Sequence, residues 1–250
     1  MPRIRLLAGA GLVALLLSLV GLIPAHVALA IFGVPADTVS GVSGTVWRGS
    51  FQRLTINNVV LGPVSWQARP SRLLLGRLAG DVEATLPDGF LNTGVAVSLG
   101  GSLSLTDLEG AAPVAWLAPA TGRDGGQLTA RFERVELDGD RVDTAIGSLQ
   151  VAGVVLPVPN AGPQLAPGDY AVTFDSRDLA PEELLAGKVT DSGGPLEISG
   201  TVTFTPPRSY ELSGTAKPRP EAPPSLRQAL QMWGPADPQG AHAIGFSGSF

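Results

Sequence analysis

Clustered acids in the run DGDRVD are the residue types with the most evident chemistry in this chain. Asp138, Asp140 and Asp143 lie within six residues, and hard cations such as Ca²⁺ bind clustered carboxylate oxygens. An EF-hand loop would also need a further Asp or Asn, a later Gly and a distal Glu, and the sequence lacks them. We therefore interpret the run as a solvated turn that joins two strands of a hairpin.

The sequence also offers no convincing pair of catalytic residues. Glu182 and Glu183 are adjacent, and acids at the start of a helix complement its dipole and project in different directions. The only imidazoles are His26, which ends an apolar segment, and His242, which lies in the alternating run AHAIGFSGSF. That alternation is typical of a strand, so we interpret His242 as an ordinary strand residue without the partners of a Ser-His-Asp triad.

Cysteine chemistry is excluded outright, because the chain contains no cysteine. Disulfides, thiolate zinc sites and cysteine nucleophiles are therefore impossible. The tryptophans could form an aromatic binding surface, but Trp66 alternates with small apolar residues in a predicted strand and Trp233 lies on the apolar side of a predicted helix. For Trp47 and Trp116, the sequence does not decide between packing and a binding surface. We expect no catalytic, metal-binding or cofactor-binding residues.

The N-terminus carries the clearest local signal. After Arg3 and Arg5 the chain has no charge from Leu6 to Ala25, about the length that a helix needs to cross a bilayer. The two arginines predict a cytoplasmic N-terminus by the positive-inside rule. A cleaved signal peptide is the alternative, since Ala28 to Ala30 has the small-x-small form of a cleavage site, but we prefer the retained anchor. In both cases the remainder is exported.

Composition favours a β-rich exported body. The 250 residues are 44% hydrophobic and 16% charged, with 32 Gly and 22 Pro, which suits many short elements separated by turns. Without Arg3 and Arg5, 15 basic residues face 22 acidic ones, for a net charge of −7. Such a surface repels phosphate backbones, so we expect no nucleic acid partner.

Alternation with a period of two runs through the exported part. In residues 77–86, Leu78, Val82 and Ala84 share one face, while Asp81 and Glu83 share the other, as in a half-buried strand. Similar runs are LTINNVVL, VSWQAR, TGVAVSL, QLTARFERVEL, TAIGSLQV, YAVTFD, LEISGTVTF, SYELSGTA and AHAIGFSGSF. The sequence therefore predicts a mainly β fold: an N-terminal transmembrane helix, then a curved, antiparallel, meander-like sheet with a few short helices.

Irregular positions refine this prediction. The apolar phase shifts near Glu133 and Arg134, which indicates a β-bulge. The fragment SGT occurs at 43–45, 199–201 and 213–215, and Gly200 and Gly214 fall on the apolar face, where a missing side chain lets strands coil or approach. Helices are predicted for PVAWLA (113–118), APEELLAG (180–187) and PSLRQALQMWG (224–234).

Two domains follow from these segments. We assign residues 1–32 to the membrane anchor, or signal peptide, with a short cytoplasmic tail, and residues 33–250 to an exported β-rich domain. The proline-rich stretch at 154–169 either divides this domain into two similar halves or is a long excursion from one continuous sheet. A sheet with so few helices leaves apolar surface that must fold over itself, line a groove or meet a partner.

The order of several motifs resembles the type II secretion system protein N family, also called general secretion pathway protein N. These motifs are the N-terminal apolar segment, SGTVWRG, LGPVSWQARPSRLLLGRL, GGPLEISGTVTF, SYELSGTAKPRP, SLRQALQMWG and the closing strand. The resemblance covers nearly the whole chain. It implies a non-enzymatic accessory component of the type II secretion apparatus, anchored in the inner membrane with its body in the periplasm.

The expected partners are therefore other secretion components, on the inner-membrane platform or the secretin side, and inner-membrane lipid through residues 6–25. The same resemblance makes SGTVWRG the first strand motif after the anchor, with Gly44 relaxing the sheet, Trp47 filling space and Arg48 in solvent. A competing hypothesis is lipid handling, because a one-sided, curved, membrane-anchored sheet resembles in outline the AsmA-type lipid-transport proteins.

Overall fold

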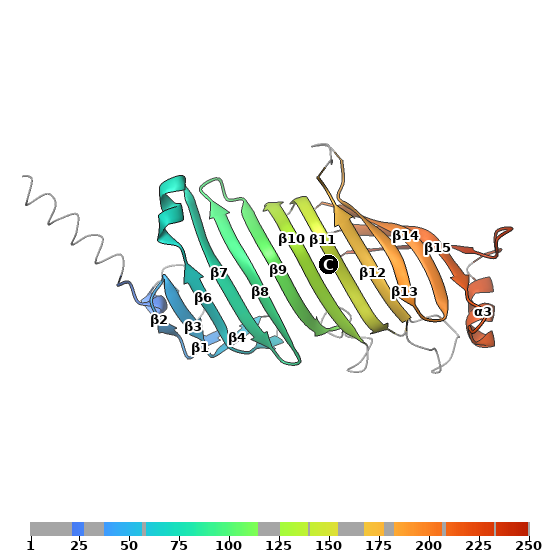
Figure 1. Ribbon diagram of the computed structural model, residues 1–250, viewed down its shortest axis with the longest axis horizontal. Helices are drawn as coiled ribbons and strands as arrows, with labels where there is room; N and C mark the ends of the chain where they lie inside the picture. The colour runs from blue at the N-terminus through green and yellow to red at the C-terminus, as the bar shows by residue number, and fades with distance from the viewer. Residues whose placement is uncertain are drawn as a thin grey trace, which may run out of the picture. The chain divides into compact units, whose positions relative to one another are not determined.

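The structure is a computed structural model, and Figure 1 shows its ribbon. It describes residues 22–27, 38–56, 59–114, 126–139, 141–154, 168–177, 183–206, 209–232 and 234–249. The chain forms two compact units, residues 1–96 and 97–250. Most described residues in both units belong to antiparallel strands, so the predicted mainly β, meander-like fold is confirmed.

The first unit begins with six strands of two to five residues each, which are followed by two strands of ten. Its main strands pair in the order β8-β7-β6-β3-β2, and a separate three-stranded sheet pairs in the order β1-β4-β5. A 3₁₀ helix, η1 (Pro70–Leu75), precedes β7 and has Pro at its first position, as is usual at a helix start. The strands are β1 (Val39–Ser40), β2 (Ser43–Gly44), β3 (Arg48–Phe51), β4 (Arg53–Ile56), β5 (Val59–Leu61), β6 (Val64–Ala68), β7 (Arg77–Leu86) and β8 (Gly89–Ser98).

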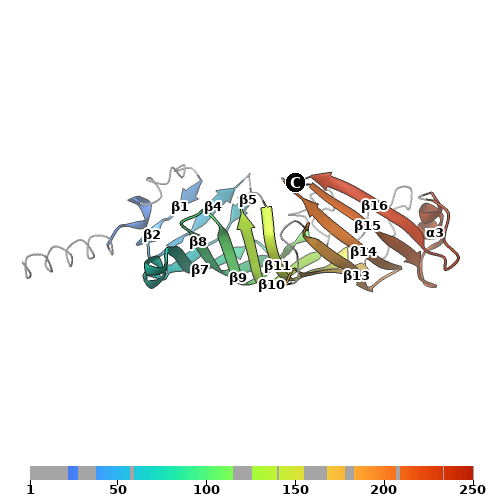
Figure 2. The same ribbon diagram turned by 90° about the horizontal axis from the view of Figure 1, so that it is seen from above.

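The second unit is a longer meander in which each strand pairs with its neighbour in the chain, in the order β16-β15-β14-β13-β12-β11-β10-β9. Figure 2 shows that the strands from β13 to β16 curl out of a common plane. The elements are β9 (Leu103–Pro113), β10 (Gln127–Asp138), β11 (Arg141–Val154), β12 (Gly168–Asp175), β13 (Ala186–Gly193), β14 (Leu196–Thr205), β15 (Ser209–Pro218), α3 (Pro224–Gln231) and β16 (His242–Ser249).

Cross-strand register makes this sheet two-faced. One row of directly paired residues runs through Val172, Val189, Gly200, Gly214 and Ile244, from β12 to β16. The adjacent row, on the opposite face, consists of Thr173, Lys188, Thr201, Ser213 and Gly245. Since successive side chains alternate between faces, one face is apolar and the other is polar.

The core lies on the apolar face, in two clusters. Helix α3 covers the first cluster by burying Leu226 and Leu230 completely against Leu196, Ala216 and Ile244. Each buried leucine contributes about 1.5–3 kcal/mol by leaving water. The second cluster is built on the aromatic row of Phe132, Phe174 and Phe204, whose neighbouring ring centroids lie 5.8 and 6.0 Å apart.

Local sequence signals located most of these elements. Residues 77–86 form β7 as predicted, the acidic run turns between β10 and β11, and the predicted bulge interrupts the register between Phe132 and Arg134. A second irregularity follows between Glu136 and Leu137. Helix α3 lies within the predicted helical segment 224–234.

Two helix predictions were wrong where the structure describes them. Pro113 ends strand β9 instead of beginning a helix, and the rest of 113–118 after Val114 lies outside the described residues. In the segment 180–187, Ala186 and Gly187 already belong to β13, which sequence reasoning missed together with β9. Asp191 concealed β13, because it places a charge at an apolar-face position of the strand.

The membrane-anchor prediction falls mostly outside the described residues, which include only positions 22–25 of the segment Leu6 to Ala25. No helix among the described residues is both long and apolar enough to span a bilayer. Residues 25–27 form a short helical turn.

Candidate functional site

The motif SGTVWRG forms a tight hairpin. Ser43 pairs with Ser50, and Gly44 pairs with Gly49, so that Thr45 to Arg48 make the turn between β2 and β3. The turn closes when Thr45 N–H donates to the Arg48 carbonyl at 2.8 Å. Gly44 has a φ of +88°, where a Cβ would meet the Arg48 carbonyl oxygen at 2.3 Å, so the chain needs glycine here.

This geometry corrects one expectation about the motif and distinguishes it from the other SGT copies. Strand β1 precedes it, so SGTVWRG is not the first strand motif, and it forms a turn with parts of two strands. The three SGT copies are also not equivalent, because positive φ values occur at Gly44 and not at Gly200 or Gly214. Arg48 is exposed, as expected for a solvated side chain.

Trp66 of β6 holds the hairpin. Its indole packs on Gly49, where a Cβ would lie 2.3 Å from the ring atom Cζ2, and its Nε1–H donates to the Val46 carbonyl at 3.1 Å. The Phe51 ring packs beside it, with centroids 4.6 Å apart. A partly buried indole that also satisfies its polar atom is a rigid anchor, which agrees with the packing role predicted for Trp66.

Residues that precede the motif also pack against it. The Val46 N–H donates to the Ile23 carbonyl at 2.9 Å, and Pro24 forms a β-bridge with Thr45. Ala25 is 2% exposed. The end of the uncharged N-terminal segment therefore belongs to the fold of the first unit.

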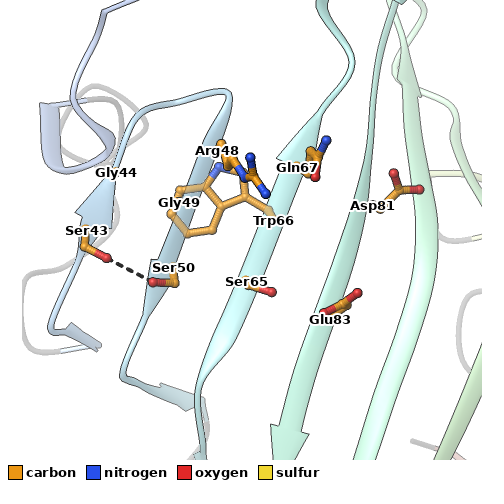
Figure 3. A pocket seen from close by; sticks show the side chains of 10 residues that line it. All are labelled: Ser43, Gly44, Arg48, Gly49, Ser50, Ser65, Trp66, Gln67, Asp81 and Glu83. Carbon is orange, nitrogen blue, oxygen red and sulfur yellow. Dashed lines mark hydrogen bonds between the residues drawn. The ribbon is translucent and has the colours of Figure 1, made fainter.

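A hollow of about 600 Å³ opens over β2, β3, β6 and β7. Figure 3 shows the ten residues that line it, with Arg48, Gln67 and Asp81 at one level. Register explains the arrangement, because Arg48 pairs with Gln67 and Gln67 with Asp81. The next polar row consists of Ser43, Ser50, Ser65 and Glu83.

Charges are distributed unevenly in this hollow. Asp81 accepts a bidentate hydrogen bond from Arg69, whose Nη2 lies 2.7 Å from both carboxylate oxygens. Ser43 and Ser50 share a hydroxyl hydrogen bond of 2.9 Å. Among the described residues, no side-chain partner pairs with the exposed ends of Arg48 or Glu83. The hollow therefore presents one cation, one carboxylate, hydroxyls and an amide to a polar group of another molecule.

The second unit holds a polar cluster within its apolar face. Arg219 pairs with Asp191, whose side chain is 8% exposed, and Arg219 also donates from Nη1 to the Gly194 carbonyl at 2.8 Å. Asp191 accepts the Ile198 N–H at 3.0 Å. Burial, with a further contribution from the Asp191 charge, raises the pKa of Tyr170 to about 12. These bonds fix the β13–β14 hairpin against the end of β15.

The residues first considered for chemistry do not come together. Asp138 and Asp143 flank the β10–β11 turn, where Asp143 pairs with Arg141 at 2.8 Å. Glu183 is exposed ahead of β13, and His242 lies in β16 as predicted, 6% exposed, with Nδ1 2.9 Å from the Gly234 carbonyl. Asp140, Glu182, Trp116 and Trp233 lie outside the described residues. Within the described ranges, no three His, Asp or Glu side chains gather as metal ligands.

Sequence reasoning missed the hollow itself. Its polar residues come from four strands, and each of those residues is ordinary in its own strand. The alternation of Asp81 and Glu83 in β7 was recognised, but no local signal aligns these acids with Arg48 or Ser50. That alignment depends on the cross-strand register.

The fold and the hollow together define a class: a β-rich protein built on two-faced antiparallel sheets, with a polar surface site and no assembled catalytic constellation in the described part. The family model for type II secretion system (T2SS), protein N, matches residues 36–245. The chain therefore belongs to the type II secretion system protein N family, and the resemblance drawn from the motifs is confirmed.

Relatives of the same description match along nearly their whole length. The chain is 28% identical over 254 residues to type II secretion system protein N of Aeromonas hydrophila, covering 97% of each chain. It is 26% identical over 242 residues to the protein of that name from Vibrio cholerae, covering 94% of each. No solved structure matches the chain.

Proposed function

We propose that this type II secretion component is a non-enzymatic accessory protein, anchored in the inner membrane by residues 6–25, with a periplasmic body that aids the export of folded proteins across the outer membrane. Family membership over residues 36–245 is the observation that carries the proposal. Its partners are other proteins of the secretion machinery.

Packing at the end of the apolar segment supports retention of the anchor. Cleavage after Ala30 would remove Ile23 and Ala25, and with them the carbonyl that accepts from Val46 N–H and a 2% exposed side chain. A leader destined for removal has no need to complete the fold of the mature domain. We therefore keep the anchored form ahead of the cleaved form.

The polar hollow is the proposed contact point for a partner protein. Arg48 and Glu83 lie on directly adjacent polar rows of one face, and neither side chain has a partner among the described residues. A partner that presents an acid to Arg48 and a base to Glu83 would be electrostatically complementary, which favours specificity and a fast encounter.

The experiment compares the extracellular proteome of the native host with and without the gene. Specific loss of secreted enzymes, with folded enzyme retained in the periplasm, is the expected result, and an unchanged secretome would contradict the proposal. A double variant, Arg48→Glu with Glu83→Lys, should restore secretion less well than the wild-type gene. Arg134→Glu is the matched control, because Arg134 is an exposed strand arginine of the second unit.

Lipid handling is a second candidate, favoured by the apolar face of the second unit. Besides the residues beneath α3, this face carries partly exposed side chains from β10, β11 and β12, among them Phe132, Leu149 and Val172. If lipid is the ligand, acyl chains should copurify with the chain and be found by mass spectrometry of an organic extract. A lipid-free extract together with a secretion defect would leave the secretion proposal alone.

A further inference from the structure

Strand β16 ends the strand order of the second unit, and β15 is its one neighbour among the described strands. All eight of its residues pair with β15, from His242 opposite Ala216 to Ser249 opposite Ser209, without a register shift. The outer side of β16 is therefore a straight row of backbone N–H and C=O groups.

Proteins normally protect such an edge with charges, proline, a bulge or a very short strand. Strand β16 reads HAIGFSGS, which contains no Asp, Glu, Lys, Arg or Pro. By contrast, β2, which ends the strand order of the first unit, has two residues, and a β-bridge from Pro24 to Thr45 follows directly. Within the described part of the chain, strand β16 therefore has none of these protections.

The loop that precedes β16 forms its hydrogen bonds within itself. In the loop before β16, the Ala241 N–H donates to the Asp237 carboxylate at 2.8 Å, and the Asp237 N–H donates to the Ala241 carbonyl at 2.8 Å. The loop thus closes on itself. No described backbone group outside β15 forms a hydrogen bond with Ala243, Ile244, Gly245, Ser247 or Gly248.

We propose that β16 pairs antiparallel with β16 of a second copy of this chain. Facing residues of two adjacent strands must point to the same side of the sheet, so the two-fold axis has to pass between one residue of the strand and the same residue of the second copy. With the axis at Gly245, Ile244 lies opposite Phe246 and Ala243 lies opposite Ser247. This register uses almost the whole strand.

Three features fit the strand to its own copy. The strand has no side-chain charge, so two copies place no like charges opposite each other. Each copy brings Phe246, which is 48% exposed, beside the other copy's Ile244 on the apolar face, an aromatic and β-branched pair of the kind that stabilises sheets. Space at the axis is open, because a Cβ on Gly245 would meet only the Leu212 carbonyl oxygen, at 3.9 Å.

Symmetry also limits the assembly. A pairing through one two-fold axis uses the β16 edge of both copies, so the product is a closed dimer and not a fibre. The interaction surface is independent of the hollow in the first unit and of the proposed role in secretion.

Disulfide trapping tests the pairing directly, since the chain has no cysteine of its own. Gly245→Cys would place a thiol opposite its symmetry mate, at a separation that a disulfide can span in an antiparallel pair. Full-length Gly245→Cys in native membranes should form a dimer on mild oxidation. Ser213→Cys is the matched control, because Ser213 is exposed on the same face but lies one strand inside the edge, and it should stay monomeric.

A charge exchange distinguishes a second copy from another occupant. With two differently tagged full-length copies, Gly245→Lys and Gly245→Asp should each abolish copurification with an identical variant, because like charges then meet at the axis. The mixed pair should restore it. Self-association unchanged by Gly245→Lys, or absence of the Gly245→Cys dimer, would overturn the proposal. Capture of a different protein by wild type and not by Gly245→Lys would assign the edge to that protein instead.

Discussion

Individual polar residues in the second unit stabilise its fold from positions on the apolar face. Asp191 stands in line with apolar neighbours along β13, yet it is paired with Arg219 and accepts a backbone N–H from Ile198. Removing one partner of a buried pair costs more than the pair contributes, because the remaining charge stays desolvated.

Asp191→Ala should therefore lower the free energy of unfolding by about 2 kcal/mol or more, as Arg219 loses its counter-ion and Ile198 N–H loses its acceptor. Urea unfolding of the purified chain measures the change. Asp81→Ala is the control, since the Asp81–Arg69 pair is about half exposed and should cost less than about 1 kcal/mol. Equal losses for the two variants would contradict the role assigned to Asp191.

Tyr170 should lose its proton at a higher pH than an ordinary tyrosine. Burial first, and then the Asp191 charge, raises its pKa to about 12. Because the folded state holds the proton more tightly than the unfolded state, the Tyr170 contribution to stability is complete below the ordinary tyrosine pKa of about 10. It is lost as the pH rises from there toward 12.

The chain has two tyrosines, so the variant Tyr210→Phe leaves Tyr170 as the only phenol. Absorbance of the phenolate during an alkaline titration then reports this group alone. A midpoint well above 10 is expected, followed by unfolding. A midpoint at the ordinary value in the folded chain would show that Tyr170 is not desolvated.

At the scale of the elements, the pairing of β14 with β15 explains the role of glycine in the sheet. Gly200 of β14 and Gly214 of β15 lie directly opposite each other, and a Cβ on Gly214 would lie 2.5 Å from the Ser199 carbonyl oxygen. The neighbouring backbones therefore approach more closely than a side chain allows. This supports the sequence prediction that these glycines permit close approach.

Gly214→Val should thus destabilise the second unit by about 1–3 kcal/mol, the usual cost of overpacking, measured by thermal or urea unfolding. Gly245→Ala is the matched control, because the Cβ there meets nothing closer than 3.9 Å and alanine lowers the entropy cost of folding. A Gly214→Val variant with unchanged melting behaviour would count against the close-approach role.

At the scale of the whole molecule, the N-terminal segment contributes to folding. Residues 22–27 supply a hydrogen bond, a β-bridge and a buried alanine to the first unit. A chain that begins at Ile31 loses all three, whereas a chain that begins at Leu22 keeps them.

Deletion of residues 1–30 should therefore lower the Tm relative to deletion of residues 1–21, by about 2–4 °C for each kcal/mol lost. Neither variant retains the complete apolar segment, so the comparison isolates residues 22–30. Intact-mass measurement of the native protein should also find residues 22–30 present. Equal melting of the two truncations, or a native mass that begins at Ile31, would support the cleaved leader instead.

Local patterns in the sequence determined a large part of this protein. Alternation located β7, β12, β14 and β16, a phase shift located the bulge in β10, and apolar spacing with an early proline located α3. These features depend on neighbours within one strand or one helix turn, where the period of the side chains is itself the physical cause. The family could also be recognised from the sequence, because the order of the motifs is specific although each motif consists of common residues.

Tertiary structure decided what depends on the alignment of distant segments. Asp191 interrupts the apolar alternation of β13, so the sequence of this segment does not resemble a strand. In the folded chain, Arg219, which lies 28 residues away, pairs with Asp191 and compensates its charge. Arg48, Gln67 and Asp81 form one row only because three strands adopt a single register. A shift of one residue would send every side chain of a strand to the other face, so the polar hollow and the outer edge of β16 exist only in the folded sheets.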